Sequence, residues 1–210
     1  MNLKFFIRTT GERELDPSIK RELGENYTLL IDKDHKPVDS FIEQLKLISD
    51  CDAILLEDDI ILCKDFVIEA QKIIKEWKNH IINFFTFPHE YFTTAFGLFQ
   101  FVYNQCTYYP KGIGKILAEK MVELRMPYNQ YDTLENKAMR ALNIPHLRPR
   151  PCLVQHIDKS TLIQSREQKP RRCIYFKDYL DELNIDIKEA YTLENQQKLT
   201  ELMNKYFTSK

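Results

Sequence analysis

Apolar and polar positions follow two different patterns along residues 1–90. Short uninterrupted apolar runs predict four buried strands, at residues 3–7, 27–31, 53–56 and 81–87. Apolar residues at helical spacing lie between these runs, as at Phe41, Leu45 and Ile48. Strand and helix in alternation indicate a mainly parallel sheet with helices on both faces. We therefore expect an α/β fold with a three-layer, Rossmann-like, mixed but mainly parallel sheet.

Turn and cap residues predict where individual helices begin and end. Asp16 and Pro17 match the N-cap and first residue of a short helix, and Gly24 matches its C-cap. Ser40 and Glu43 match a capping box, so we expect the next helix to begin at Ser40.

The second half of the chain is less regular. Residues 99–109 predict one or two strands, for which antiparallel pairing is open. A helical stripe covers residues 113–124, and another helix is predicted to open at Asp132. The C-terminal part is first basic and then helical. We expect a main domain at 1–165 and a helical C-terminal extension at 166–210 packed on it.

Composition excludes several classes of protein. The chain has 210 residues, with 30 Lys and Arg against 31 Asp and Glu, which argues against binding through phosphate neutralisation over the whole surface. No run of about 18 apolar residues occurs, so no membrane span is expected. The five cysteines are scattered and lack CxxC spacing, which predicts a reducing, cytoplasmic setting.

Glycine is scarce, and this bears on how a nucleotide could be bound. Only five glycines are present, and neither GxxxxGK[ST] nor GxGxxG occurs. Any phosphate group would therefore be held by something other than a glycine-rich loop.

Three consecutive carboxylates, Glu57, Asp58 and Asp59, follow the apolar run at 53–56. Their charges repel each other in an apolar setting unless a cation lies among them. Strand alternation sends Glu57 and Asp59 to one side and Asp58 to the other. Carboxylate oxygens suit Mg²⁺ or Mn²⁺, which bridge to phosphate oxygens. A solvated acidic turn is the alternative.

Residues 52–62, together with Phe66, resemble the metal-binding segment of nucleotide-sugar glycosyltransferases with the GT-A fold. In that group a hydrophobic strand ends in a D-x-D or E-D-D set. The resemblance implies a divalent cation, Mn²⁺ or Mg²⁺, held by Asp59 with Glu57 or Asp58 assisting. This cation would neutralise the diphosphate of a sugar donor, and Asp58 is also expected among the donor contacts.

A second segment, at residues 151–160, is similar to the P-S-L-V-Q-H-x-G-x-x-S stretch of several inverting GT-A families. It implies that His156 lies near the donor diphosphate and completes the metal sphere. Asp158 stands where the families have glycine. A structural histidine is the alternative for His156.

Further donor contacts are expected where the first two strands end. The resemblance places Thr9, Thr10 and Arg13 near the donor, with Arg13 able to pair with the diphosphate. It also places Asp32 near the nucleoside. A surface salt bridge for Arg13 and an Asx turn for Asp32 are the alternatives.

The acceptor side is expected near residues 104–112, which resemble the strand and turn that lead to the acceptor helix. Three tyrosines are assigned to it: Tyr108, Tyr109 and Tyr131. Residues 128–134 resemble a P-x-D-x-x-L segment in which the aspartate is the general base, which implies that Asp132 is catalytic. A capping box of Asp132 with Glu135 is the alternative.

The resemblance covers residues 1–165 and implies an inverting, metal-dependent glycosyltransferase of the hexosyltransferase type. It would move a sugar from a nucleotide diphosphate donor, with UDP expected, to a hydroxyl of a glycan, a protein or a modified nucleic acid. Two other classes stay open: a metal-dependent phosphoesterase or nuclease, and a non-catalytic module that binds nucleic acid through the basic stretch 166–172. A buried, inert thiol is favoured over a nucleophile at Cys106.

Overall fold

The computed structural model describes residues 2–34, 36–85, 104–125, 131–157 and 172–208. Its strands are β1 (Leu3–Thr9), β2 (Thr28–Ile31), β3 (Asp52–Glu57), β4 (Ile60–Leu62), β5 (Ile81–Asn83), β6 (Cys106–Tyr109), β7 (His146–Leu147) and β8 (Val154–His156). Its helices are α1 (Pro17–Leu23), α2 (Pro37–Ile48), α3 (Phe66–Glu76), α4 (Ile113–Glu123), α5 (Tyr131–Ala141), α6 (Lys177–Glu182) and α7 (Leu193–Thr208).

Six strands form one mixed sheet in the order β2-β1-β3-β6-β5-β7. Strands β2, β1 and β3 are parallel, and β7 is parallel to β5. Strand β6 runs antiparallel between β3 and β5. The predicted mixed α/β sheet is confirmed, and the antiparallel strand falls within the segment where that pairing was open. A second, two-stranded sheet pairs β4 with β8 antiparallel.

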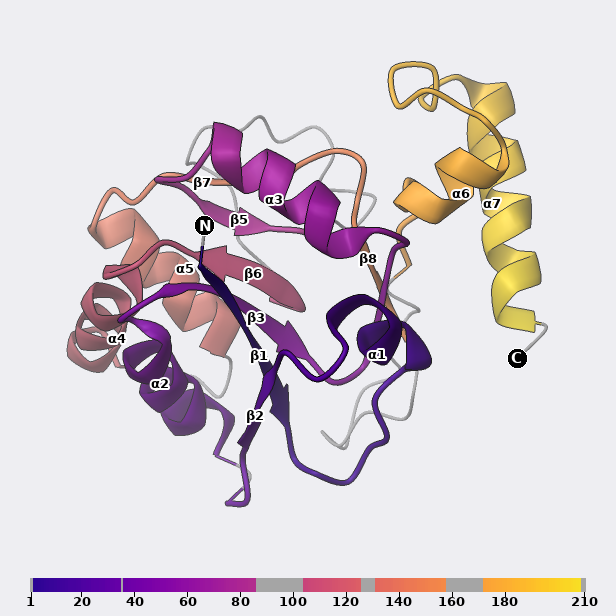
Figure 1. Cartoon of the computed structure of the whole chain (residues 1–210). Helices are drawn as coiled ribbons and strands as arrows, with labels where there is room; N and C mark the ends of the chain where they lie inside the picture. Colours follow the sequence, from indigo (N-terminus) through magenta and orange to yellow (C-terminus); the bar gives the residue numbers. More distant parts are fainter. Residues whose placement is uncertain (1, 35, 86–103, 126–130, 158–171, 209–210) are drawn as a thin grey trace.

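The two faces of the large sheet bury separate apolar cores. Helices α2, α4 and α5 cover one face, where Phe41, Leu45 and Ile48 are buried as their spacing predicts. Helices α1 and α3 cover the other face, where Ile19 and Phe66 pack beneath the strands. Figure 1 shows these helical layers on either side of the sheet, which makes the fold three-layered.

The C-terminal segment extends the second of these cores. Cys173, Tyr179 and Leu199 are buried with the residues of α1 and α3. The Lys64 amide also donates a 2.9 Å hydrogen bond to Asp178 in α6. Figure 1 shows α6 and α7 side by side, on the side of the molecule where β8 lies. None of the helices built from the described residues is both long enough and apolar enough to span a bilayer.

Helix starts show how local signals succeed and fail. Helix α1 begins as predicted, because Asp16 Oδ1 accepts the Ser18 amide at 2.9 Å. Helix α2 begins at Pro37, so the predicted capping box at Ser40 is wrong. Proline fits the first helical position, and the Ser40 hydroxyl instead accepts from Gln44 Nε2 at 2.9 Å. The predicted strand at 81–87 ends at Asn83, and residues 86–103 lie outside the described part.

Gly114 generates a prediction about packing between α2 and α4. A Cβ atom at this position would lie 2.2 Å from the Leu45 carbonyl oxygen, so the helices would have to separate. We expect Gly114→Ala to lower the free energy of unfolding by about 3 kcal/mol, because the overpacking cost exceeds the helix-propensity gain of alanine. Urea unfolding measures the change.

The matched control is Glu119→Ala, an exposed position on the same helix. It should change the free energy of unfolding by less than about 0.5 kcal/mol. Equal effects of the two substitutions would contradict the packing argument.

Candidate functional site

Glu57, Asp58 and Asp59, called the acidic triplet below, lie at the carboxyl end of β3, beside the end of β1. In the parallel register Glu57 pairs with Arg8, so the loops after both strands leave the same edge of the sheet. The small sheet brings in a third segment, because Ile60 pairs with His156 and the Ile157 amide donates to the Asp59 carbonyl at 2.8 Å. Ligand sites of open α/β sheets lie at this edge.

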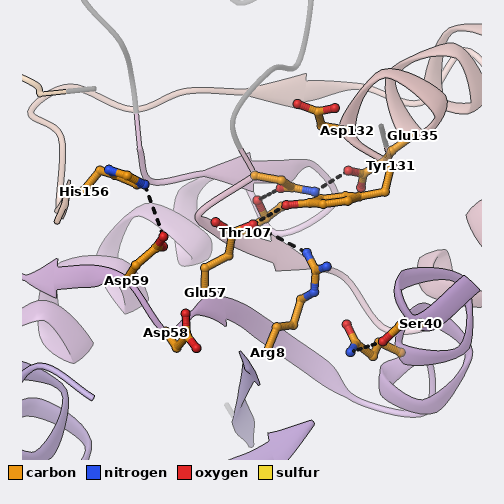
Figure 2. Close-up of polar contacts among 12 residues, drawn as sticks. Arg8, Ser40, Glu57, Asp58, Asp59, Thr107, Tyr131, Asp132, Glu135 and His156 are labelled. Atoms are coloured by element: carbon orange, nitrogen blue, oxygen red, sulfur yellow. Dashed lines mark hydrogen bonds and ion pairs between the residues drawn. The ribbon is translucent and has the colours of Figure 1, made fainter. Parts of the chain in front are cut away.

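Asp59 lies next to a guanidinium and an imidazole that come from distant parts of the chain. Arg13 Nη1 donates to Asp59 Oδ2 at 2.9 Å, and His156 Nε2 lies 3.4 Å from the same oxygen; Figure 2 shows His156 pointing toward Asp59. Burial by itself would raise the pKa of Asp59, but His156 and Arg13 outweigh it and lower that pKa. The other oxygen, Oδ1, is buried and has no hydrogen-bond partner in the described structure.

Asp58 is hydrogen-bonded to the last residue of β1 and to the loop that follows it. Thr9 Oγ1 donates to its Oδ2 at 2.6 Å, and Arg13 Nη1 lies 3.3 Å from its Oδ1. The Gly11 amide in turn donates to Thr9 Oγ1 at 2.9 Å. Arg13 thus bridges Asp58 and Asp59 with its side chain only 15% exposed, which places it inside the site rather than in a surface salt bridge.

Glu57 is engaged by a different set of groups. The Tyr131 hydroxyl donates to Glu57 Oε1, and Arg8 Nη1 lies 3.6 Å from that oxygen. Burial and the nearby charge of Asp59 raise the pKa of Glu57 despite the opposing influence of Arg8 and Tyr131. Figure 2 shows Glu57 between Arg8 and Tyr131, whereas Asp59 is turned to His156.

These contacts bear on the expected cation. Among the described residues, no three His, Cys, Asp or Glu side chains gather into a set that could hold a metal ion. Asp59 and His156 nevertheless offer a carboxylate and an imidazole, donors that suit Mn²⁺. A divalent ion often takes its other ligands from water and phosphate. The buried, unpartnered Asp59 Oδ1 fits such a jointly held cation.

Two of the three tyrosines assigned to the acceptor side are core residues. The Tyr108 hydroxyl donates to Asp52 Oδ1 at 3.0 Å, and Asp52 begins β3, so Tyr108 points to the opposite edge of the sheet from Glu57. Tyr109 is 1% exposed and donates to Glu135 at 2.7 Å. We correct both assignments: side chains of a buried central strand are enclosed by the helical layers.

Tyr131 does lie at the site, but its contacts differ from those expected. The Arg8 guanidinium lies 4.2 Å from its ring centroid, and the Phe41 ring lies 4.8 Å away. The ring is therefore packed against protein groups and is not an open surface for an acceptor.

Asp132 lies in the first turn of α5, next to Tyr131. Its Oδ1 accepts the Thr133 amide at 2.7 Å. The alternative capping box with Glu135 is wrong, because Glu135 is fully buried and accepts hydrogen bonds from Tyr109 and Asn104. Asp132 is thus placed near the triplet without a capping role for Glu135.

The remaining predicted donor contacts lie at the ends of β1 and β2. Thr10 Oγ1 is buried without a hydrogen-bond partner in the described chain. Asp32 follows β2, and its amide donates to the Thr9 carbonyl at 2.9 Å. Its Oδ1 accepts the Lys36 amide at 3.2 Å, so a turn is present at Asp32, with Lys36 as its partner.

The basic stretch lies mostly outside the described part of the chain, and Cys106, at the start of β6, is a buried thiol. Residues 166–171 lie outside the described part. The Arg172 guanidinium lies 3.9 Å from the Phe207 ring centroid in α7. Cys106 is buried, and burial raises the pKa of its thiol well above the usual value, which favours an inert residue.

Glu135 and Arg8 are ionisable residues that sequence reasoning missed at this edge. Glu135 is 0% exposed, and burial raises its pKa from 4.5 to about 8. Asn104 Nδ2 donates to both Glu135 and the Tyr109 hydroxyl, and the Thr107 hydroxyl donates to Asn104 Oδ1. The one signal for Glu135 in the sequence is its spacing of four residues from Tyr131, which puts both on one helical face.

Comparisons with known proteins add little to this geometry. No protein-family model matches the chain, and no curated protein matches it in sequence. One similar solved structure is the crystal structure of A197 from STIV, at 10% sequence identity and a TM-score of 0.47. The similarity covers 80% of this chain and 100% of that chain. A function must therefore be argued from the site itself.

The buried Glu135 carboxyl predicts a specific pH dependence of stability. Its pKa is higher in the folded than in the unfolded chain, so stability falls as pH rises from 4.5 to about 8. Each pH unit in that window corresponds to about 1.4 kcal/mol at most. We expect Glu135→Gln to remove this slope, so that the variant gains stability relative to wild type by several kcal/mol between pH 5 and pH 9.

Urea unfolding across this pH range measures the two curves. Glu43→Gln, at an exposed position, should run parallel to wild type. Parallel curves for Glu135→Gln as well would show that Glu135 does not titrate in this window.

Proposed function

We propose that this protein is a metal-dependent glycosyltransferase that binds a nucleotide diphosphate sugar at the carboxyl end of β3. The observation that most directly supports the proposal is the meeting of Asp59 with His156 and Arg13. A carboxylate, an imidazole and a guanidinium together suit a divalent cation and a diphosphate.

Unsatisfied polar atoms concentrate at this edge and support a ligand there. In the described structure, Thr10, Asp59 and Gln105 each have a buried side-chain oxygen without a hydrogen-bond partner. Buried polar groups in proteins are nearly always paired with protein, water or ligand. A polar ligand at the ends of β1 and β3 would supply such partners.

Each side chain then has a defined task. Asp59 and His156 would hold the cation, which when bound supplies positive charge against the diphosphate leaving group. Arg13 would pair with phosphate oxygens, to which a guanidinium can donate two parallel hydrogen bonds. Thr10 would donate or accept a hydrogen bond at the sugar donor, and Asp32 would contact the nucleoside, which is expected to be uridine.

Asp132 is the proposed general base. It would take the proton from an acceptor hydroxyl while that oxygen forms a bond to the anomeric carbon. The bond from that carbon to the diphosphate breaks on the opposite side, and the nucleoside diphosphate leaves with the bonding electron pair. Attack opposite to the leaving group inverts the configuration at the anomeric carbon. The acceptor is a hydroxyl of a glycan, a protein or a modified nucleic acid.

A binding experiment tests the site without requiring the acceptor. Titration of the protein with Mn²⁺, followed by calorimetry with UDP, should show that UDP binding depends on the metal. We expect Asp59→Asn to weaken Mn²⁺ binding at least about 100-fold, because a charged ligand is lost, and His156→Ala to weaken it about 10- to 100-fold. Release of UDP from UDP-sugars should fall with both variants.

Glu43→Gln is the matched control, since it neutralises an exposed carboxylate of α2. It should leave Mn²⁺ and UDP binding at wild-type strength. UDP binding that is indifferent to Mn²⁺, or hydrolysis of a simple phosphodiester with no affinity for UDP, would overturn the proposal.

A further inference from the structure

Asp132 lies in the first turn of α5, and among the described residues its carboxylate has a hydrogen bond only within that turn. The hydrogen bond to its Oδ1 comes from the next residue, the Thr133 amide, at 2.7 Å. Figure 2 shows Asp132 above the strand end, on the first turn of the helix. The rotation of α5 about its axis therefore decides where this carboxylate points.

Tyr131 ties the first turn of α5 to three other elements. Its hydroxyl donates to Glu57 at the end of β3. Its ring lies 4.2 Å from the Arg8 guanidinium of β1 and 4.8 Å from the Phe41 ring of α2. Arg8 also lies 3.6 Å from Glu57, so the tyrosine, the arginine and the glutamate form one closed set.

Glu135 ties α5 to β6 one helical turn later. Its two oxygens accept from the Tyr109 hydroxyl, at 2.7 Å, and from Asn104 Nδ2. Asn104 is bonded along the chain to Gln105, whose carbonyl accepts the Glu57 amide at 2.8 Å. Glu135 is thus connected, through Asn104 and Gln105, to Glu57, which accepts the hydrogen bond of Tyr131.

Packing alone would not give this arrangement. Leu134 and Ala138 bury the helix against an apolar core, and apolar contacts are non-directional. Burying the Glu135 carboxyl is costly, and an apolar residue of similar size would often stabilise such a position more. Directional hydrogen bonds at positions four residues apart, however, specify the rotation of the helix.

We propose that Tyr131 and Glu135 are positioning residues, which set the rotation of α5 and so hold Asp132 against the end of β3. Asp132 follows Tyr131 directly and is rotated from it by about 100° around the helix. The position of the carboxylate is thereby linked to Glu57, two residues from Asp59. This inference rests on the proposed function, in which Asp132 is the base and Asp59 holds the cation.

Tyr131→Phe tests the first anchor, because it removes the hydroxyl and keeps the ring between Arg8 and Phe41. We expect the rate of UDP release from a UDP-sugar, at saturating Mn²⁺ and donor, to fall about 10- to 100-fold, as expected for a misplaced catalytic group. The Kd values for Mn²⁺ and UDP should stay within about twofold of wild type, because the Tyr131 hydroxyl donates to Glu57, whereas the proposed ligands of the cation and diphosphate are Asp59, His156 and Arg13. Tyr27→Phe, a partly buried tyrosine outside this cluster, should leave the rate at the wild-type value.

A double-mutant cycle separates positioning from general damage. In an Asp132→Asn background, Tyr131→Phe should cause no further loss of rate, because its effect acts through Asp132. A loss that multiplies in the double variant, or an unchanged rate in the single variant, overturns the inference. Glu135→Gln gives a second cycle should Tyr131→Phe fold poorly.

Hydrogen exchange measures the anchoring independently of activity. Tyr131→Phe should increase exchange at the amides of residues 135–138, which donate to carbonyls of the first turn of α5, while α4 keeps wild-type protection. Unchanged exchange at the start of α5 overturns the anchoring. A wild-type protein that binds neither Mn²⁺ nor UDP would instead overturn the proposed function, and the exchange result would still decide whether Tyr131 anchors the helix.

Discussion

The crowding of three consecutive carboxylates, one buried and two half-buried, at one strand end is the constraint on which this edge of the molecule depends. Glu57, Asp58 and Asp59 would repel one another in a low-dielectric setting, and desolvation adds to the cost. The fold offsets this by giving each carboxylate two partners, with Arg13 shared by two of them: Arg8 and Tyr131 for Glu57, Thr9 and Arg13 for Asp58, Arg13 and His156 for Asp59. The loop after β1, the start of α5 and the end of β8 therefore all contact the carboxylates at this edge.

Sheet topology makes these meetings possible. Parallel pairing of β1 with β3 brings the loop that carries Arg13 to the triplet, and the small β4–β8 sheet brings His156. The antiparallel β6 begins at the same edge, so Asn104 and Gln105 stand next to the end of β3. The edge thus combines strand ends of both directions, and α5 is attached to it through Tyr131 and Glu135.

Sequence patterns were reliable where a signal acts over a few residues. Asp16 caps α1 because its carboxylate reaches an amide two residues away, and this needs no distant partner. The same reasoning failed at Ser40, since Pro37 begins the helix a turn earlier and leaves the serine to bond Gln44. It failed again at Tyr108 and Tyr109, where aromatic residues read as an acceptor surface are core residues of a central strand.

By itself the sequence determined the alternation of strands and helices, the apolar faces of α2 and α4, and the position of an acidic triplet at a strand end. These follow from periodicity and from contacts between near neighbours. Tertiary structure alone decided that Glu57 turns to Arg8 and Tyr131 and that Glu135 is buried. The physical reason is that these contacts depend on strand order and register, which join segments that carry no local information about one another.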